Sequence, residues 1–133
     1  GDRWVKNALE SLAVLSDYAS LFNVPIMLEN VFELDPGIHA EIFEAISSPF
    51  LGFCLDIGHQ GVFSKTGIGG WLKDLGDRLG QIHLHDNNGV HDDHLAIGEG
   101  IIDFDGLFSW LYEQGKSPIL TLEPHKEKAV MPT

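Results

Sequence analysis

The chain alternates amphipathic segments with short apolar ones, and this alternation restricts its fold more than any other feature. Apolar residues spaced three and four positions apart predict helices, whereas short apolar runs between turn residues predict strands. Strands that alternate with helices are typical of βαβ units and a parallel sheet. The expected helices lie near 4–22, 37–47, 67–79 and 105–112, and the expected strands near 25–31, 52–57, 80–86 and 118–123.

The length of the chain limits how such units can close. Its 133 residues suit one domain, but a complete barrel of eight strand–helix units needs about 250 residues. We therefore expect an α/β fold, half of a TIM (β/α)8 barrel, as a single domain over residues 1–133. Two interpretations stay open: a fragment of a longer chain, which we favour, or a half-barrel that forms a homodimer to cover its strand edges.

Composition favours a folded protein with an acidic surface. The chain is 44% apolar and 21% charged, which is not the composition of a disordered segment. It has 20 acidic against 8 basic residues, a formal net charge of −12. Such a surface lacks the basic patch of a nucleic-acid-binding protein. We therefore expect a small-molecule substrate and no nucleic-acid partner.

Cysteine use and hydropathy favour a cytoplasmic protein. The single cysteine, Cys54, cannot form an internal disulfide, which suits a reducing compartment. No segment approaches the roughly 18 consecutive apolar residues of a transmembrane helix, and the first residues do not resemble a signal peptide. We expect a cytoplasmic protein without membrane association, in which Cys54 is a small buried side chain.

Each predicted strand carries an ionisable side chain near its C-terminal end. Side chains alternate between the two faces of a strand, so one face is apolar and the other carries carboxylates and imidazoles. In a barrel the second face points inward, and its late positions lie at the mouth where TIM-barrel active sites are built. The four residues are Glu29, Asp56, His83 and Glu123, separated by 27, 27 and 40 positions.

The joint placement of these four residues favours a metal site. Taken singly, each has an ordinary explanation, such as a salt-bridged acid, a helix cap or a hydrogen-bonded core histidine. Converging unpaired carboxylates, however, are strongly unfavourable inside a protein. A divalent cation is the simplest compensation, and mixed imidazole and carboxylate ligation suits Zn²⁺, Mn²⁺ or Fe²⁺ better than Ca²⁺.

Five short motifs contain these residues and their neighbours. In chain order they are Leu-Glu-Asn-Val at 28–31, Cys-Leu-Asp-Ile-Gly-His at 54–59, Ile-His-Leu-His-Asp-Asn at 82–87, Asp-Asp-His-Leu-Ala-Ile-Gly-Glu-Gly at 92–100 and Leu-Thr-Leu-Glu at 120–123. Together they resemble the xylose isomerase-like TIM barrels, which include AP endonuclease family 2 of the endonuclease IV type and many sugar isomerases and epimerases. The resemblance covers about residues 5–125 and only the second half of the family's barrel.

The resemblance implies roles for individual residues. The one-metal isomerases and epimerases of the family hold a divalent metal, here Zn or Mn, with residues that match Glu29, Asp56, His83 and Glu123. Glu29 and Glu123 would also be the catalytic groups that move a proton. His85 is expected to contact the substrate.

The endonuclease IV type adds ligands and holds three zinc ions. The resemblance implies that His59, Asp92 and His94 are such additional metal ligands. Two further histidines of that site come from the first half of the barrel, so this chain alone would hold an incomplete trinuclear site.

Three functions follow from these residues. The first is hydrolysis of a small phosphodiester or sugar phosphate at a multinuclear metal site, because a one-metal isomerase has no need of Asp92 and His94. The alternative is aldose–ketose isomerisation or epimerisation of a sugar at one metal, in which His59 contacts substrate instead of metal. The third is a catalytically inactive half-barrel that dimerises.

Overall fold

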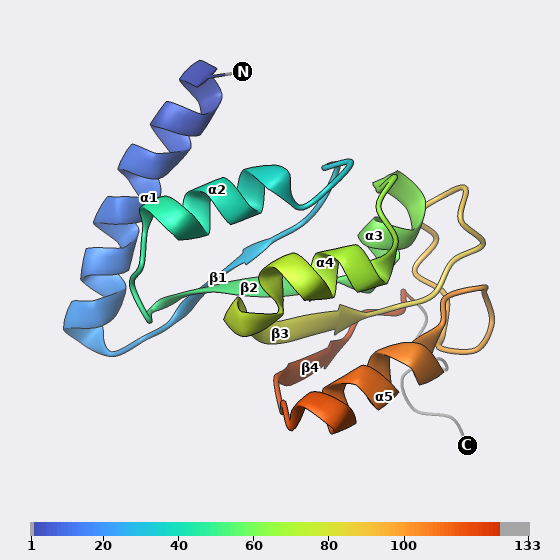
Figure 1. Cartoon of the computed structure of the whole chain (residues 1–133). Helices are drawn as coiled ribbons and strands as arrows, with labels where there is room; N and C mark the ends of the chain where they lie inside the picture. The colour runs from blue at the N-terminus through green and yellow to red at the C-terminus, as the bar shows by residue number, and fades with distance from the viewer. Residues whose placement is uncertain (1, 126–133) are drawn as a thin grey trace.

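The computed structural model, which describes residues 2–125, contains one sheet of four parallel strands in the order β1-β2-β3-β4 (Figure 1). Parallel pairing of strands that are consecutive in the chain is the arrangement of a βα barrel. The fold is therefore α/β and half of a barrel, as predicted. The strands are β1 (Ile26–Glu29), β2 (Leu51–Asp56), β3 (Leu79–Leu84) and β4 (Ile119–Leu122); the helices are α1 (Asp2–Phe22), α2 (Gly37–Ala45), α3 (Ile57–Phe63), α4 (Ile68–Leu75), the 3₁₀ helix η1 (Gly76–Arg78) and α5 (Phe104–Gln114).

The helix α3 is the one element within residues 2–125 that the apolar spacing did not predict. It has seven residues and follows β2 without a loop. Its N-terminus is capped by Asp56, whose side chain accepts a hydrogen bond from the backbone N–H of His59. A cap of this kind satisfies a backbone donor that the first helical turn leaves free. Asp56 therefore ends a strand and begins a helix.

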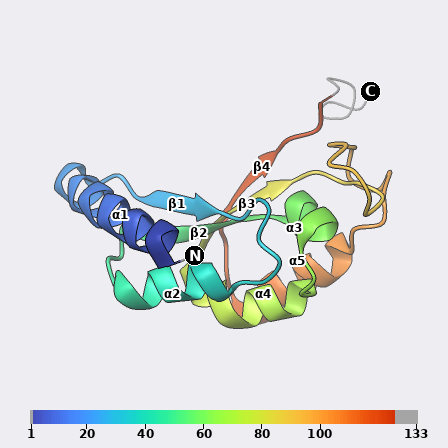
Figure 2. The same ribbon diagram turned by 90° about the horizontal axis from the view of Figure 1, so that it is seen from above.

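The core lies between the sheet and the helices α2, α4 and α5, which lie on the same side of the sheet (Figure 2). Trp71 of α4 is fully buried and stacks on Phe53 of β2, with the ring centroids 6.1 Å apart. Burying an apolar side chain of this size stabilises the fold by about 1.5–3 kcal/mol. The strand residues that face the helices here are Phe53, Leu55, Ile82 and Leu84.

The outer strand β4 departs from this pattern. We expected its apolar residues to pack under helices, yet Leu120 and Leu122 are 46% and 49% exposed. Both pair in register with buried residues of β3, so they face the same side, but within residues 2–125 no helix covers them. The face of α1 that carries Tyr18, Leu21 and Phe22 is exposed as well. These apolar surfaces lie on the two margins of the half-barrel.

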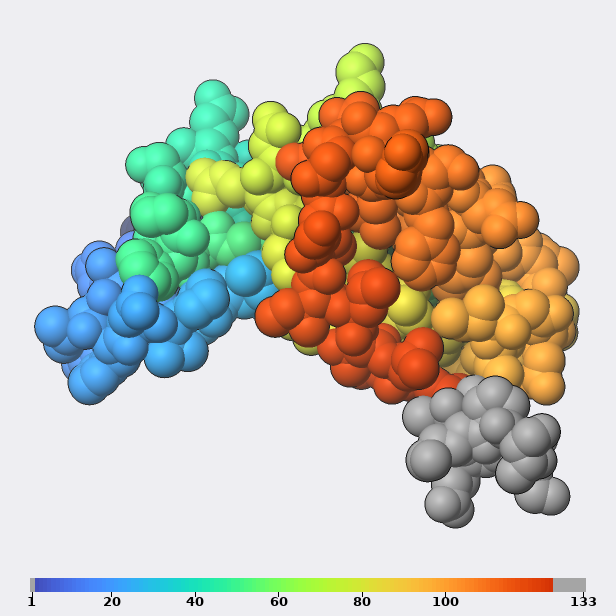
Figure 3. All heavy atoms as spheres, turned by 90° about the horizontal axis from the view of Figure 1, so that it is seen from below, coloured from blue at the N-terminus to red at the C-terminus, as the bar shows by residue number. Residues whose placement is uncertain are grey.

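The face of the sheet opposite α2, α4 and α5 is open. In a space-filling view the outline is hollowed between the N-terminal segment, in blue, and β4, in red (Figure 3). The polar strand-end residues described below come from this open face. No helix of the described chain is long and apolar enough to cross a lipid bilayer.

Candidate metal centre

Three of the four strand-end residues, all acids, converge on a ring nitrogen of the fourth, His83. Nδ1 of His83 lies 2.9 Å from Oε1 of Glu29, 3.4 Å from Oε1 of Glu123 and 3.7 Å from Oδ2 of Asp56. Each residue comes from a different strand or from the position just after it. We call this group, Glu29, Asp56, His83 and Glu123, the first centre.

The register of the sheet explains the convergence. Asp56 pairs with His83 across β2 and β3, and Glu29 is the last residue of β1. Because parallel strands end at the same edge of a sheet and side chains alternate between faces, these groups project from one corner of the open face. Glu123 follows β4, and its backbone N–H donates to the carbonyl of Leu84, which holds it beside the end of β3.

Asp56 is fully buried, and its two carboxylate oxygens have different surroundings. Oδ1 accepts hydrogen bonds from the backbone N–H of His59 and from Nε2 of His85, both at 2.7 Å. Oδ2 faces the first centre and has no hydrogen-bond partner among residues 2–125. Burial raises the pKa of Asp56, but the hydrogen bonds from His85 and His59 outweigh it and lower the pKa overall. A charged carboxylate with one unpaired, buried oxygen fits a cation ligand.

Glu29 is affected by both burial and the neighbouring acid Asp56. Burial is the main factor that raises its pKa, and the neighbouring Asp56 raises it further. Glu29 and Glu123 each keep about a third of their side chains exposed. The first centre is therefore open to solvent on its two glutamates and closed behind Asp56.

His83 is supported from behind by polar residues of the same open face. The amide nitrogen of Gln81 lies 3.3 Å from Nε2 of His83 and donates to the hydroxyl of Thr121. Metal-binding histidines donate the N–H of their second ring nitrogen to a neighbouring acceptor, so metal binding through Nδ1 of His83 would place the side-chain oxygen of Gln81, rather than its nitrogen, beside Nε2. Gln81 was not among the residues predicted from the sequence, although its position two residues before His83 places it on the same face.

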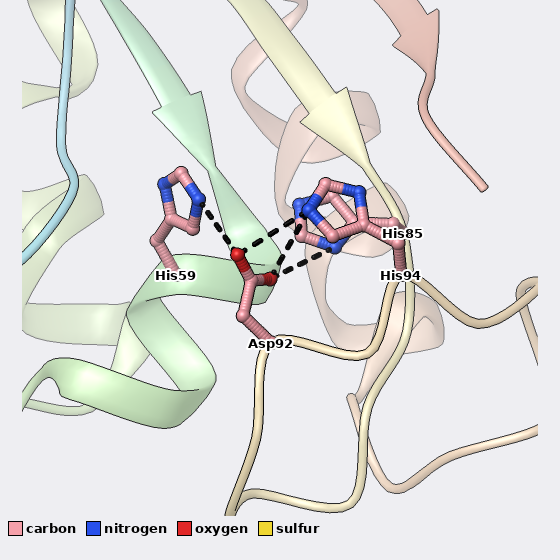
Figure 4. A group of neighbouring side chains, drawn as sticks. All are labelled: His59, His85, Asp92 and His94. Carbon is pink, nitrogen blue, oxygen red and sulfur yellow. Dashed lines mark hydrogen bonds and ion pairs between the residues drawn. The ribbon is translucent and has the colours of Figure 1, made fainter. Parts of the chain in front are cut away.

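A second group, His59, His85, Asp92 and His94, lies beside the first (Figure 4). One candidate ligand atom from each residue lies within 4.8 Å of the others. The carboxylate of Asp92 is at its middle, 3.3 Å from Nε2 of His59 and 3.3 Å from Nε2 of His94. We call this group the second centre. It gathers all three additional ligands implied by the resemblance.

Two histidines of the second centre are oriented by main-chain carbonyls. Nδ1 of His59 lies 2.9 Å from the carbonyl oxygen of Asn30, and Nδ1 of His94 lies 2.7 Å from that of Glu123. A hydrogen on Nδ1 that donates to a carbonyl leaves the lone pair on Nε2, and in both residues Nε2 faces Asp92. Burial lowers the pKa of His59, but the Asn30 carbonyl and the nearby carboxylates outweigh it and raise the pKa.

Asn30 connects the ends of β1 and β2 through hydrogen bonds. Its side-chain amide bonds to both the backbone N–H and the carbonyl of Asp56, at 2.8 and 3.0 Å. The side chain thus continues the pairing of β1 with β2 beyond the last strand residue. Asn30 belongs to the Leu-Glu-Asn-Val motif at 28–31, but the motif did not indicate this role.

Asp86 holds the loop that carries Asp92 and His94. It is fully buried, and its carboxylate accepts four backbone N–H hydrogen bonds. The loop also returns to Asp86 through paired backbone bonds with Leu95. Sequence reasoning missed this role; an acid before a glycine-containing polar loop was the only signal. The four donors are Asn87, Gly98, Gly100 and Ile102.

We expected His85 to contact the substrate, but its side chain has no exposed surface in the structure. It is fully buried and lies behind Asp56, to which its Nε2 is bonded. Its ring stacks on that of His94, with centroids 3.8 Å apart and an interplanar angle of 2°. His85 therefore contacts residues of both centres. Cys54 is also buried, as predicted.

Comparisons with known proteins agree on one family. The family model described as xylose isomerase-like TIM barrel matches residues 2–132. Two uncharacterized proteins of Methanocaldococcus jannaschii are 32% and 35% identical over 88% and 80% of this chain. The matched part is 42% of each of those proteins, so the chain spans less than half the length of these relatives.

Solved structures give the same result. A D-tagatose 3-epimerase-like protein superposes with a TM-score of 0.83 at 29% identity, over 95% of this chain and 50% of its own. A Thermus thermophilus protein, soaked with ZnCl₂, gives a TM-score of 0.75 at 31% identity, over 93% and 48%. The IOLI protein, with a bound zinc atom, gives 0.78 at 25% identity, over 97% and 50%.

Proposed function

Since the chain belongs to the xylose isomerase-like TIM barrel family, we propose that it is the metal-binding half of a sugar isomerase or epimerase. The observation that carries the proposal is the convergence of three carboxylates on Nδ1 of His83, with Oδ2 of Asp56 lacking a hydrogen-bond partner in the described part of the chain. Hydrolysis was the first function expected from the sequence. The likeness to a D-tagatose 3-epimerase-like protein favours the alternative instead.

The residues of the first centre fit a divalent cation of the zinc or manganese type. Imidazole and carboxylate ligands together suit such ions, and two of the similar structures were determined with zinc. A cation held by Glu29, Asp56, His83 and Glu123 would hold adjacent oxygens of a sugar and polarise its carbonyl group.

Glu29 and Glu123 are the groups proposed to move protons. They come from the two outermost strands, and each contacts Nδ1 of His83 from its own strand. A carboxylate beside the sugar would take the proton from the carbon next to the carbonyl, and a second acid would return one.

The test is proton exchange at a sugar carbon. The intact protein, loaded with Mn²⁺ or Zn²⁺, is incubated with ketohexoses such as D-tagatose in D₂O, and the products are analysed by chromatography and NMR. We expect deuterium at the carbon next to the carbonyl. Glu29→Gln and Glu123→Gln should abolish this exchange, whereas Glu99→Gln, at an exposed loop acid, should not. Loaded protein that exchanges no proton on any ketose or aldose would refute the proposal.

Phosphodiester hydrolysis is the second candidate, and the second centre favours it. One candidate ligand atom from each of His59, Asp92 and His94 lies within 4.8 Å of the others, and clustered metals activate water and stabilise a leaving oxygen. Metal content separates the two functions. Two or more ions per chain, reduced by Asp92→Ala, together with hydrolysis of bis(p-nitrophenyl) phosphate, would support hydrolysis. One ion that is unaffected by Asp92→Ala would leave only the isomerase proposal.

A further inference from the structure

An exposed aromatic side chain lies in the loop that follows β1. Phe32 is three positions after Glu29 and is 72% exposed. Its ring meets that of Phe63 from α3 edge-on, with the ring centroids 4.9 Å apart and an interplanar angle of 72°. Leu34, in the same loop, is 50% exposed. An exposed apolar patch beside a polar cluster is typical of a binding surface. We call Phe32 and Phe63 the aromatic pair.

The aromatic pair is continuous with the first centre through His59. His59 and Phe63 are four positions apart on α3, so they lie on the same side of this helix, and their ring centroids are 6.0 Å apart. Nδ1 of His59 lies 3.5 Å from Oδ2 of Asp56 and 3.8 Å from Oε1 of Glu29. A row of three rings therefore leads from the first centre out to Phe32.

Hydrogen bonds hold the loop of Phe32 against the segment that follows α3, beside which it lies (Figures 1 and 2). The carbonyl oxygen of Leu34 accepts three hydrogen bonds. The donors are the backbone N–H groups of Lys65 and Thr66 and the hydroxyl of Ser64. That hydroxyl accepts a further bond from the indole N–H of the buried Trp71. Since the loop is already ordered, packing a ligand on its exposed ring costs little conformational entropy.

We propose that the aromatic pair is the specificity-determining side of the sugar site, on which the carbon chain of the sugar packs where it extends beyond the first centre. This inference rests on the proposed function and names the class of sugar. A phenyl ring has neither a donor nor an acceptor for a sugar hydroxyl, so a terminal hydroxyl placed there gives up hydrogen bonds to water. A terminal methyl group packs on the ring without that loss. Deoxy sugars are therefore the preferred substrates.

The test compares each ketohexose that exchanges a proton with its own 6-deoxy derivative, in the intact protein loaded with Mn²⁺. Deuterium uptake gives kcat and KM for both sugars. The wild-type protein should favour the deoxy sugar by about 10-fold in kcat/KM, the lower end of what an apolar contact discriminates. Phe32→Ala and Phe63→Ala should remove this preference by raising KM for the deoxy sugar while kcat stays the same, because packing contributes equally to ground state and transition state.

Binding alone gives a second readout. In saturation-transfer NMR of the deoxy sugar with the wild-type protein, the methyl protons should receive the strongest saturation, and Phe32→Ala should reduce it. Phe108→Ala is the matched control, because Phe108 is a partly exposed phenylalanine of α5; it should keep the wild-type KM and preference. Circular dichroism checks that each variant is folded, and the exposure of Phe32 makes Phe32→Ala the variant that retains the fold.

Two kinds of failure are distinguishable. A wild-type protein that exchanges protons but does not favour the methyl group would overturn this inference and leave the proposed function standing. So would a Phe32→Ala protein with unchanged KM and preference, or a Phe108→Ala protein that loses both to the same extent. If the loaded protein exchanges a proton on no sugar, the proposed function fails and this inference fails with it.

Discussion

The imidazole of His83 and the carboxylate of Glu29 lie 2.9 Å apart although 54 positions separate them in the chain. Their strands, β3 and β1, are not neighbours, because β2 lies between them. The contact forms across the end of β2, directly above Asp56, which is why the same nitrogen also approaches Asp56. A substitution that removes one member of this group should therefore alter the interactions of the other members.

Asp56→Asn is expected to lower the metal affinity of the first centre by at least about 100-fold, because it removes the charge of the one fully buried carboxylate in the group. Equilibrium dialysis with Zn²⁺ measures this in the intact protein. Asp93→Asn, an exposed acid, is the control and should bind normally. Normal binding by Asp56→Asn would contradict the assignment of the first centre.

Metal binding should weaken as the pH falls, and it should begin to weaken above the usual carboxyl range. Ligands must lose their protons to bind a cation. The pKa of Glu29 is raised by burial and by Asp56, so Glu29 takes up its proton at a higher pH than an ordinary glutamate. Affinity for Zn²⁺, measured from neutral to acidic pH, should therefore decline as the pH falls through that raised value. An affinity that stays constant until the ordinary range of glutamate would argue against this.

Asp86→Ala should destabilise the protein by about 3 kcal/mol, because it leaves four backbone N–H groups of one loop without their acceptor. Urea denaturation followed by circular dichroism gives the free energy of unfolding. The same variant should lose metal at the second centre, since Asp92 lies in this loop. Asp93→Ala should change stability by no more than about 0.5 kcal/mol. Equal stabilities of the two variants would show that the loop is held in another way.

Cys54 should resist alkylation in the folded protein. Burial is the main factor that raises its pKa to about 12, with further contributions from Glu29, Asp56 and Glu123. The reactive thiolate is therefore scarce at neutral pH. Iodoacetamide labelling followed by peptide mass mapping should find Cys54 unmodified in the native protein and modified in denaturant. Rapid labelling of the native protein would show that Cys54 on β2 is accessible to the reagent.

Much of the architecture was predictable because it depends on local patterns. The four strands were placed within a few residues, since apolar runs between turn residues identify them without knowledge of the fold. The helix α3 was missed because seven residues are too few to show a helical period. The exposure of Leu120 and Leu122 was also missed, because alternation predicts which face a side chain occupies but not whether anything covers that face.

The sequence by itself determined that Glu29, Asp56, His83 and Glu123 occur at or just after the C-terminal ends of the four strands, at positions that share one face. The alternation of side chains and the common direction of parallel strands are enough to decide that. Only the tertiary structure decided which atoms meet. Asp56 accepts a hydrogen bond from His85 with one oxygen, while the other has no hydrogen-bond partner among residues 2–125, and a loop brings Asp92 to a second centre. These contacts join residues far apart in the chain, so they depend on strand register and loop path, which local patterns do not encode.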